Sequence, residues 1–159
     1  MSQAWVSVIG VGSPHGDVRL GWVALEALQQ SARLAPLIPQ RLRLDARDRP
    51  GVLLLSAWHG AHTVILVDAV RSGAEPGSAL RLADADIHPP GSASMSTHDY
   101  GVAAAVALAR ALRQLPASLV LLGLEADPAS NGESLSPCLQ AALPGFVQLI
   151  EHEVLTAAR

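Results

Sequence analysis

The sequence predicts an α/β domain, a three-layer α/β/α sandwich around a mainly parallel, twisted sheet of about five strands. Short apolar runs typical of buried strands alternate along the chain with longer segments whose apolar residues recur at helical spacing. The chain has 159 residues, about the length of one domain, and it contains neither an internal repeat nor a linker. We therefore expect residues 1–159 to form a single domain.

Two strands and the helix between them are expected first. AWVSVIGVG (4–12) is a short, mostly apolar run of the kind buried on both faces of a parallel sheet. Apolar residues then recur at helical spacing over 20–34, until two prolines break the pattern. RLRLDARD (41–48) alternates arginine and leucine, as a half-buried strand does.

The middle of the chain contains the clearest strand. A short helix is expected over 50–60, with Pro50 in its first turn and a glycine at its end. HTVILVDAV (62–70) has four uninterrupted apolar residues and predicts a central strand. After turn residues, SALRLAD (78–84) predicts a weaker strand.

The last third of the chain predicts two helices and one strand. Residues 87–96 have loop composition, and the alanine-rich segment 99–114 has strong helix propensity. ASLVLLGLEAD (117–127) predicts another buried strand, and DPASNGES (127–134) a loop. A helix over about 136–157 completes the alternation.

Composition excludes several classes of function. The chain has no lysine, which excludes a Schiff-base lysine, a P-loop lysine and a Ser-Lys dyad. A net charge of −3, scattered arginines and few aromatic residues argue against nucleic acid as a partner. No apolar run approaches the roughly 18 residues of a membrane span. One cysteine and no basic leader lead us to expect a cytoplasmic protein.

The loop after the first expected strand allows two interpretations. Gly10, Gly12 and Gly16 resemble a dinucleotide-binding fingerprint, but the third glycine comes one position late. Pro14 has no N–H to offer a phosphate, and Asp45, the natural ribose partner, lies 29 residues after Gly16. The loop is either a nucleotide site or a tight strand-to-helix turn that needs glycine for packing.

Asp17, Asp68 and the segment around Glu125 are expected at the carboxyl ends of the strands, where open α/β sheets bind ligands, and His98 is expected at the start of a helix that begins near the same edge. Asp17 follows the first glycine loop, and Asp68 follows four buried apolar residues, where an unpartnered carboxylate is costly. His98 lies in a capping-box pattern, STHD, where the helix dipole favours neutral imidazole. Two carboxylates and an imidazole suit Zn²⁺ or Ni²⁺. The structural alternatives are an aspartate that caps a turn and a surface histidine.

Other nucleophile and ligand candidates have weaker contexts. No G-x-S-x-G elbow is present, and we expect Cys138 to be a packing residue at a helix start. The remaining histidines are expected at the surface or in loops: His15, His59, His62, His88 and His152.

Four segments in this order resemble the nickel–iron hydrogenase maturation proteases over nearly the whole chain. They are VIGVGS with the following GD and LGW, VILVDAVRSGAEPGSALRL, STHDYGVAAAVALARAL and LVLLGLEADPAS with LSPCLQAALPGFVQLI. The resemblance implies an endopeptidase that removes the C-terminal tail of the hydrogenase large-subunit precursor after nickel insertion. It also implies that the protein holds no permanent metal or organic cofactor, because the substrate supplies the nickel. We expect the protein to be a monomer.

Carried over residue by residue, the resemblance implies that Asp68 and His98 contact the nickel. The first acidic motif differs, since the family pattern is G-x-G-N and then D-[DE]-x-x-G. Here Ser13 replaces the asparagine, the loop is about one residue shorter, and Val18 stands at the position that is usually the ligand. Either Asp17 takes over this role, giving a site of Asp17, Asp68 and His98, or the third ligand is missing. In the second case the chain is a non-cleaving, chaperone-like binder of the precursor.

Overall fold

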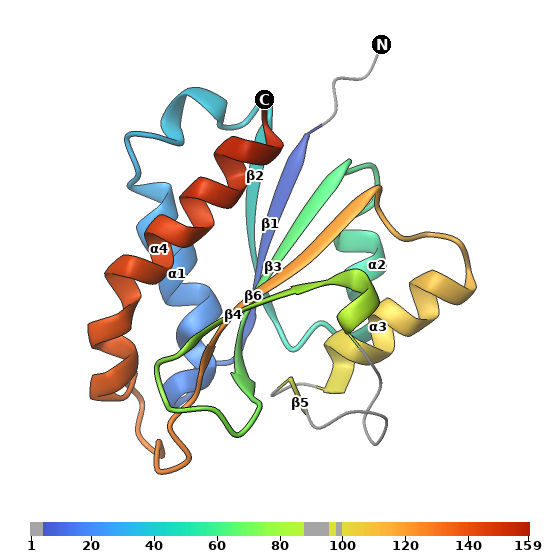
Figure 1. The fold of residues 1–159 in the computed structure, drawn as a ribbon. Coiled ribbons are helices and arrows are strands. Elements are labelled where there is room, and N and C mark those ends of the chain that lie inside the picture. The colour runs from blue at the N-terminus through green and yellow to red at the C-terminus, as the bar shows by residue number, and fades with distance from the viewer. Residues whose placement is uncertain (1–4, 88–95, 98–99) are drawn as a thin grey trace.

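The computed structural model describes residues 5–87, 96–97 and 100–159 and shows a mostly parallel sheet (Figure 1). The order of the five longer strands is β2-β1-β3-β6-β4, and a two-residue strand, β5, pairs with β3. Only β4 and β5 run antiparallel to their neighbours. The strands are β1 (Val6–Gly12), β2 (Leu42–Asp48), β3 (Thr63–Arg71), β4 (Ala79–Ala83), β5 (Ser96–Thr97) and β6 (Ser118–Glu125).

Helices cover both faces of this sheet and confirm the predicted three layers. Helices α1 (Leu20–Gln29) and α4 (Pro137–Ala157) lie on one face, and α2 (Leu54–Ala57) and α3 (Tyr100–Ala111) lie on the other (Figure 1). Each face has its own hydrophobic cluster. The polypeptide thus forms an α/β/α sandwich whose middle layer is buried on both sides.

Alternation along β3 shows which side chains face which layer. Val67 and Ala69 belong to the cluster under α1 and α4, whereas Leu66 and Val70 belong to the cluster under α2 and α3. Because successive side chains of a strand point to opposite faces, this assignment also applies to the polar residues of β3.

Some elements differ from the sequence-based expectation. The helix expected over 20–34 ends at Gln29, and Leu34 is buried from a turn that precedes a 3₁₀ helix, η2 (Ala35–Leu37). The helical spacing of apolar residues over 20–34 therefore indicates which side chains are buried, and a residue in a turn can be buried as well as one in a helix. The helix expected over 50–60 is divided into η3 (Gly51–Leu53) and α2.

The short elements η4 (Asp84–Asp86) and β5 are further differences from the expectation. Strand β5 falls at the end of the expected loop 87–96, because Ser96 and Thr97 pair with the last residues of β3. The two paired segments are far apart in the sequence, so the local periodicity of the sequence does not predict their pairing.

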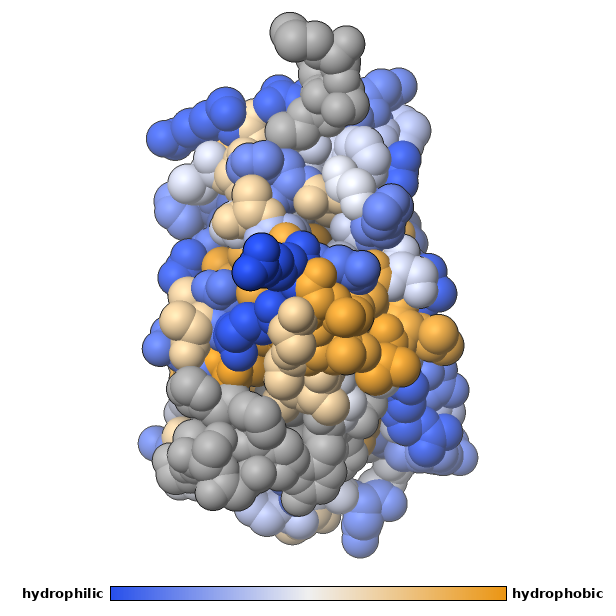
Figure 2. All heavy atoms as spheres, turned by 90° about the vertical axis from the view of Figure 1, so that its right-hand side faces the viewer, coloured by the Kyte–Doolittle hydropathy of each residue, from blue (hydrophilic) through white to orange (hydrophobic). Residues whose placement is uncertain are grey.

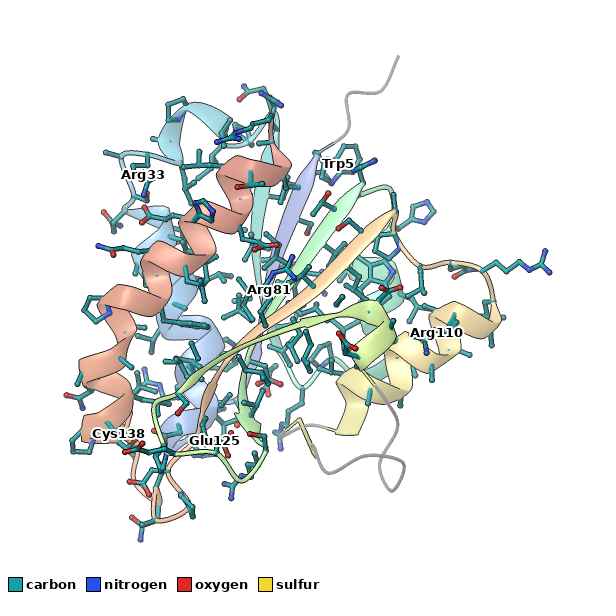
Figure 3. The ribbon with its side chains drawn as sticks, in the orientation of Figure 1. Trp5, Arg33, Arg81, Arg110, Glu125 and Cys138 are labelled. Atoms are coloured by element: carbon teal, nitrogen blue, oxygen red, sulfur yellow. The ribbon has the colours of Figure 1, made fainter. Side chains whose placement is uncertain are left out.

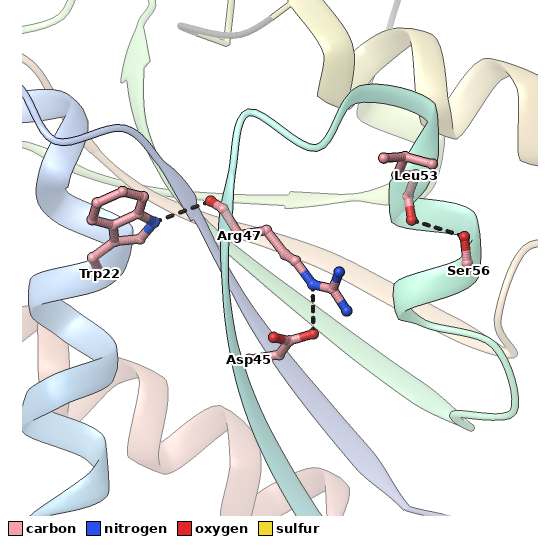
Figure 4. A network of polar contacts seen from close by, with 5 residues as sticks. All are labelled: Trp22, Asp45, Arg47, Leu53 and Ser56. Carbon is pink, nitrogen blue, oxygen red and sulfur yellow. Dashed lines mark hydrogen bonds and ion pairs between the residues drawn. The ribbon is translucent and has the colours of Figure 1, made fainter.

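Polar contacts fix the helices to the sheet edges. The Trp22 indole N–H of α1 donates to the backbone carbonyl of Arg47 on β2 at 3.0 Å (Figure 4). At the opposite edge, Glu153 of α4 accepts two hydrogen bonds from Arg81 of β4, which raise the pKa of that guanidinium. Both edge strands are therefore held by the α1/α4 layer.

The surface of the α2/α3 layer carries an apolar patch among hydrophilic side chains (Figure 2). The exposed large hydrophobic side chains of the described residues belong to η3, to α3 and to the turn that follows α3: Val52, Leu53, Leu108 and Leu112. Among the described residues, no helix has both the length and the apolar character needed to cross a membrane.

Candidate functional site

The carboxyl ends of the parallel strands β1, β3 and β6 lie at one end of the molecule. Glu125 and Cys138 lie at this end in Figure 3, and Trp5, which precedes β1, lies at the other. Loops that follow β1, β3 and β6 meet here, so residues far apart in the sequence become neighbours. We call this end the carboxyl rim.

Asp68 lies in β3 close to the rim and is only 1% exposed. It pairs in register with Gly123 of β6, and three further residues follow it before β3 ends at Arg71. Asp68 therefore lies within the strand, whereas the apolar run alone suggested that it ends the strand. Its alternation with Leu66 and Val70 directs its side chain to the α2/α3 side.

His98 lies outside the described residues, as does Asp99 of the expected capping box. The residue before His98 is placed by β5, in which Thr97 is the antiparallel partner of Val70 on β3. Val70 is two residues after Asp68. The chain thus returns to the neighbourhood of Asp68 directly before His98.

Asp17 lies in the 3₁₀ helix η1 (Gly16–Arg19) and is 3% exposed. Its carboxylate accepts hydrogen bonds from the Asp127 N–H at 2.8 Å, the Ser136 N–H at 2.7 Å and the Ser136 hydroxyl at 2.9 Å. A carboxylate has about four acceptor positions, so most of them are occupied. Asp17 joins η1 to both ends of the loop between β6 and α4.

Further hydrogen bonds attach the middle of that loop, residues 126–136, to η1. The Asp17 N–H donates to the Ser130 hydroxyl at 3.1 Å, and the Arg19 guanidinium donates to the Glu133 carbonyl at 2.9 Å. Gly16 has a φ of +52°, and a Cβ there would lie 2.8 Å from the Ser130 hydroxyl oxygen. The loop and η1 therefore form one hydrogen-bonded unit.

The glycine loop is a packing turn. A Cβ on Gly12 would lie 2.4 Å from the Val18 carbonyl oxygen, and one on Gly10 would lie 2.4 Å from the Gly21 carbonyl oxygen. The N–H groups of Ser13 and Val18 donate within the loop, and that of Asp17 donates to Ser130. Since a phosphate cradle needs such N–H groups directed to the ligand, the geometry favours the packing interpretation over nucleotide binding.

Glu125 is a third buried carboxylate of the rim, 5% exposed at the end of β6. It accepts hydrogen bonds from the Ser72 N–H at 2.8 Å, the Ser72 hydroxyl at 2.7 Å and the Gly73 N–H at 3.0 Å. Glu125 thereby holds the turn that follows β3, as Asp17 holds the loop that follows β6.

Sequence reasoning missed the part played by Ser136. Ser-Pro at the start of a helix is typical of an N-cap, and Ser136 is the N-cap of α4. Its hydroxyl, however, caps no N–H of α4 and donates to Asp17, which lies 119 residues away. No local pattern indicates such a distant partner.

The remaining candidates behave as expected where the structure describes them. Cys138 is half-buried and packs against the cluster under α1 and α4. His88 lies outside the described residues, and the other weak candidates, His15, His59, His62 and His152, are exposed. Among the described residues, no three His, Cys, Asp or Glu side chains are grouped to hold a metal ion.

Known proteins resemble this chain in sequence and in fold. A model of the HycI hydrogenase maturation protease family matches residues 50–153, a range that contains Asp68 and His98 and leaves out Asp17. The hydrogenase expression/formation protein HupD of Thiocapsa roseopersicina is 26% identical over 151 residues, covering 93% of this chain. The chain spans 66% of the length of that relative.

Solved structures share the fold. The hydrogenase maturating endopeptidase HybD from E. coli has a TM-score of 0.80 at 20% identity, covering 96% of this chain and 93% of that one. The [NiFe] hydrogenase maturation protease HybD from Thermococcus kodakarensis has a TM-score of 0.74 at 18% identity, covering 94% and 99%. With the family match over residues 50–153, the conclusion is that the chain belongs to the hydrogenase maturation protease family.

Proposed function

We propose that this protein is an endopeptidase that removes the C-terminal tail from a nickel-loaded hydrogenase large-subunit precursor. The family match carries the proposal, because it includes Asp68, a carboxylate buried at the rim of the sheet. The proposal includes a cytoplasmic location and a monomeric enzyme. The reaction adds water across one peptide bond and leaves a new C-terminal carboxylate and a free amine.

Asp68 and His98 are the residues that we propose to contact the nickel of the precursor. A carboxylate and a neutral imidazole are suitable ligands for this ion. Asp68 is held in the central strand, and His98 directly follows Thr97, the partner of Val70 in the β3–β5 pair. The ion belongs to the substrate, so its contact with these residues would orient the scissile peptide in the precursor.

The role of Asp17 as a third nickel ligand, beside Asp68 and His98, stays a prediction. Its carboxylate already accepts three hydrogen bonds from the loop between β6 and α4. We therefore propose that Asp17 acts as a positioning residue, and that Val18 leaves the usual acidic position without a carboxylate.

This reading of Asp17 and Val18 favours a second candidate function, a family member that binds the precursor without cutting it. A ligand set with one carboxylate fewer would still recognise the ion while holding the scissile bond less firmly. The two functions differ in one observable, the removal of the tail.

The deciding experiment incubates the protein with nickel-loaded and nickel-free precursor and measures the product masses. Loss of the tail from the loaded form alone supports the endopeptidase. A stable complex with an intact precursor supports the non-cleaving binder and contradicts the endopeptidase.

Asp68→Asn tests the nickel contact in the same assay. The variant should fold, as measured by thermal unfolding, and should leave the tail in place because it lacks the carboxylate charge. Wild-type processing by Asp68→Asn would remove Asp68 from the mechanism.

A further inference from the structure

A cavity of about 370 Å³ opens at the carboxyl rim between η1 and the loop of residues 126–136. His15 and Val18 line it from the side of η1, Asn131 and Gly132 from the side of the loop, and Arg71 from the end of β3. Asp17, the positioning residue proposed above, also lines this cavity, whereas His15, Arg71, Asn131 and Gly132 have no part in the mechanism proposed above. We call this space the rim cavity.

The walls of the rim cavity are held in place before any ligand enters. Both ends of the loop are attached to Asp17, and its middle is attached through Ser130 and through the bond from Arg19 to the Glu133 carbonyl. A site whose walls are already ordered loses little conformational entropy on binding. The rim cavity is in this sense preorganised.

The lining of the rim cavity suits a peptide. Asn131 offers both a donor and an acceptor, Arg71 and His15 offer ring or guanidinium nitrogens, and Gly132 leaves its backbone accessible. A peptide backbone carries one donor and one acceptor at each residue, so a mixed lining matches it better than a lining of one kind.

The position of the cavity relative to Asp68 indicates which peptide it binds. Arg71 follows Asp68 by three residues on β3, a distance of about 10 Å along a strand. The odd number of steps places the two side chains on opposite faces of the sheet, with Asp68 on the α2/α3 side. A chain that passes from Asp68 over the end of β3 therefore enters the rim cavity after about three extended residues.

We propose that the rim cavity binds the segment of the precursor tail that follows the scissile peptide bond, as an extended polar peptide. This inference rests on the proposed function and deepens it, since it names where the leaving segment lies. The nickel-bearing part of the precursor then lies on the Asp68 side of β3, and the tail lies on the side of η1.

To test this proposal, we fill the rim cavity with a bulky side chain introduced at a position that has room for one. A Cβ on Gly132 would meet no atom within 4 Å, and the same holds for Gly145, an exposed glycine of α4 outside the cavity. We compare Gly132→Trp with the matched control Gly145→Trp. Asn131→Trp fills the cavity from an exposed neighbour, should Gly132→Trp fail to fold.

Each variant is assayed with two nickel-loaded precursors, one with the full tail and one with a tail of a single residue. Gly132→Trp should raise KM for the full-tail precursor by about tenfold or more, with kcat within about twofold. It should leave processing of the one-residue tail unchanged, because that tail does not reach the cavity. Gly145→Trp should behave as wild type with both precursors.

Binding is measured separately in an Asp68→Asn background, where the tail should stay attached. Addition of Gly132→Trp should weaken the affinity for the full-tail precursor by about tenfold. Unchanged KM and unchanged affinity in folded Gly132→Trp and Asn131→Trp would overturn the rim-cavity proposal alone. Failure of the wild-type protein to process either loaded precursor would overturn the proposed function, and this proposal with it.

Discussion

The carboxylate of Asp17 accepts hydrogen bonds from both the backbone N–H and the hydroxyl of Ser136, at 2.7 and 2.9 Å. Asp17 lies just after the first strand, and Ser136 is the residue at which the last helix begins. One buried side chain thus joins the turn after β1 to the start of α4 at the carboxyl rim. The rim cavity and the loop after β6 both depend on this connection.

Asp17→Asn should lower the free energy of unfolding by about 2 kcal/mol, measured by urea denaturation. The asparagine side chain has a single oxygen, and its amide nitrogen then faces N–H donors of Asp127 or Ser136. Asp86→Asn is the matched control, because Asp86 is exposed, and it should change stability by less than about 0.5 kcal/mol. If Asp17→Asn is as stable as wild type but binds the nickel-loaded precursor more weakly, Asp17 is a ligand and not an anchor.

Glu125→Gln should loosen the turn after β3 without unfolding the sheet. Glutamine has one side-chain oxygen in place of two for the donors of Ser72 and Gly73. We expect a loss of about 1–3 kcal/mol in stability and faster hydrogen exchange at the Ser72 and Gly73 amides. Unchanged exchange at these two amides would show that Glu125 does not hold the turn.

Gly12→Ala should destabilise the fold, because the new methyl group meets the Val18 carbonyl oxygen at 2.4 Å. Since that atom belongs to the backbone, relief requires η1 to move, at a cost of about 1–3 kcal/mol. Gly132→Ala is the control, with no atom within 4 Å of its Cβ, and should be close to neutral in thermal unfolding. Equal melting temperatures for the two variants would contradict a close contact between β1 and η1.

The same loop predicts a negative result with nucleotides. NAD(P) and nucleotide monophosphates at millimolar concentration should not shift the melting temperature, because the N–H groups of Ser13, Asp17 and Val18 donate within the protein. A stabilising shift would restore the nucleotide-binding interpretation of Gly10, Gly12 and Gly16.

Val18→Glu should strengthen divalent-ion binding by the isolated protein. Val18 lies beside Asp17 in η1, at the position that the family resemblance assigns to an acidic ligand. The resemblance implies that a carboxylate there would complete a ligand set with Asp68 and His98, and we expect a gain of about tenfold or more in Zn²⁺ affinity by calorimetry, or about 1.4 kcal/mol. Val18→Gln has nearly the same shape without the charge, so equal affinities for the two variants would contradict the missing-ligand explanation.

The amino-acid sequence by itself determined the order of the main strands and helices and the fold class. Periodicity is a local property, and the runs over 62–70 and 117–127 become β3 and β6 with bounds shifted by one or two residues. The burial of Asp68 also followed from the sequence, because four apolar residues directly precede it. Family membership was predicted from four ordered segments and is confirmed by the match over residues 50–153.

Only the tertiary structure decided how the rim is built. The partners of Asp17 lie 110 and 119 residues away, and those of Glu125 lie 52 and 53 residues away. The close approach of Gly12 to Val18 depends on the path of the turn, and β5 depends on pairing with a strand formed much earlier in the chain. Hydrophobic burial in a helix or strand gives a periodic pattern of apolar residues in the sequence. A buried hydrogen bond between distant segments gives no such pattern, because it depends on where the two segments meet in the fold.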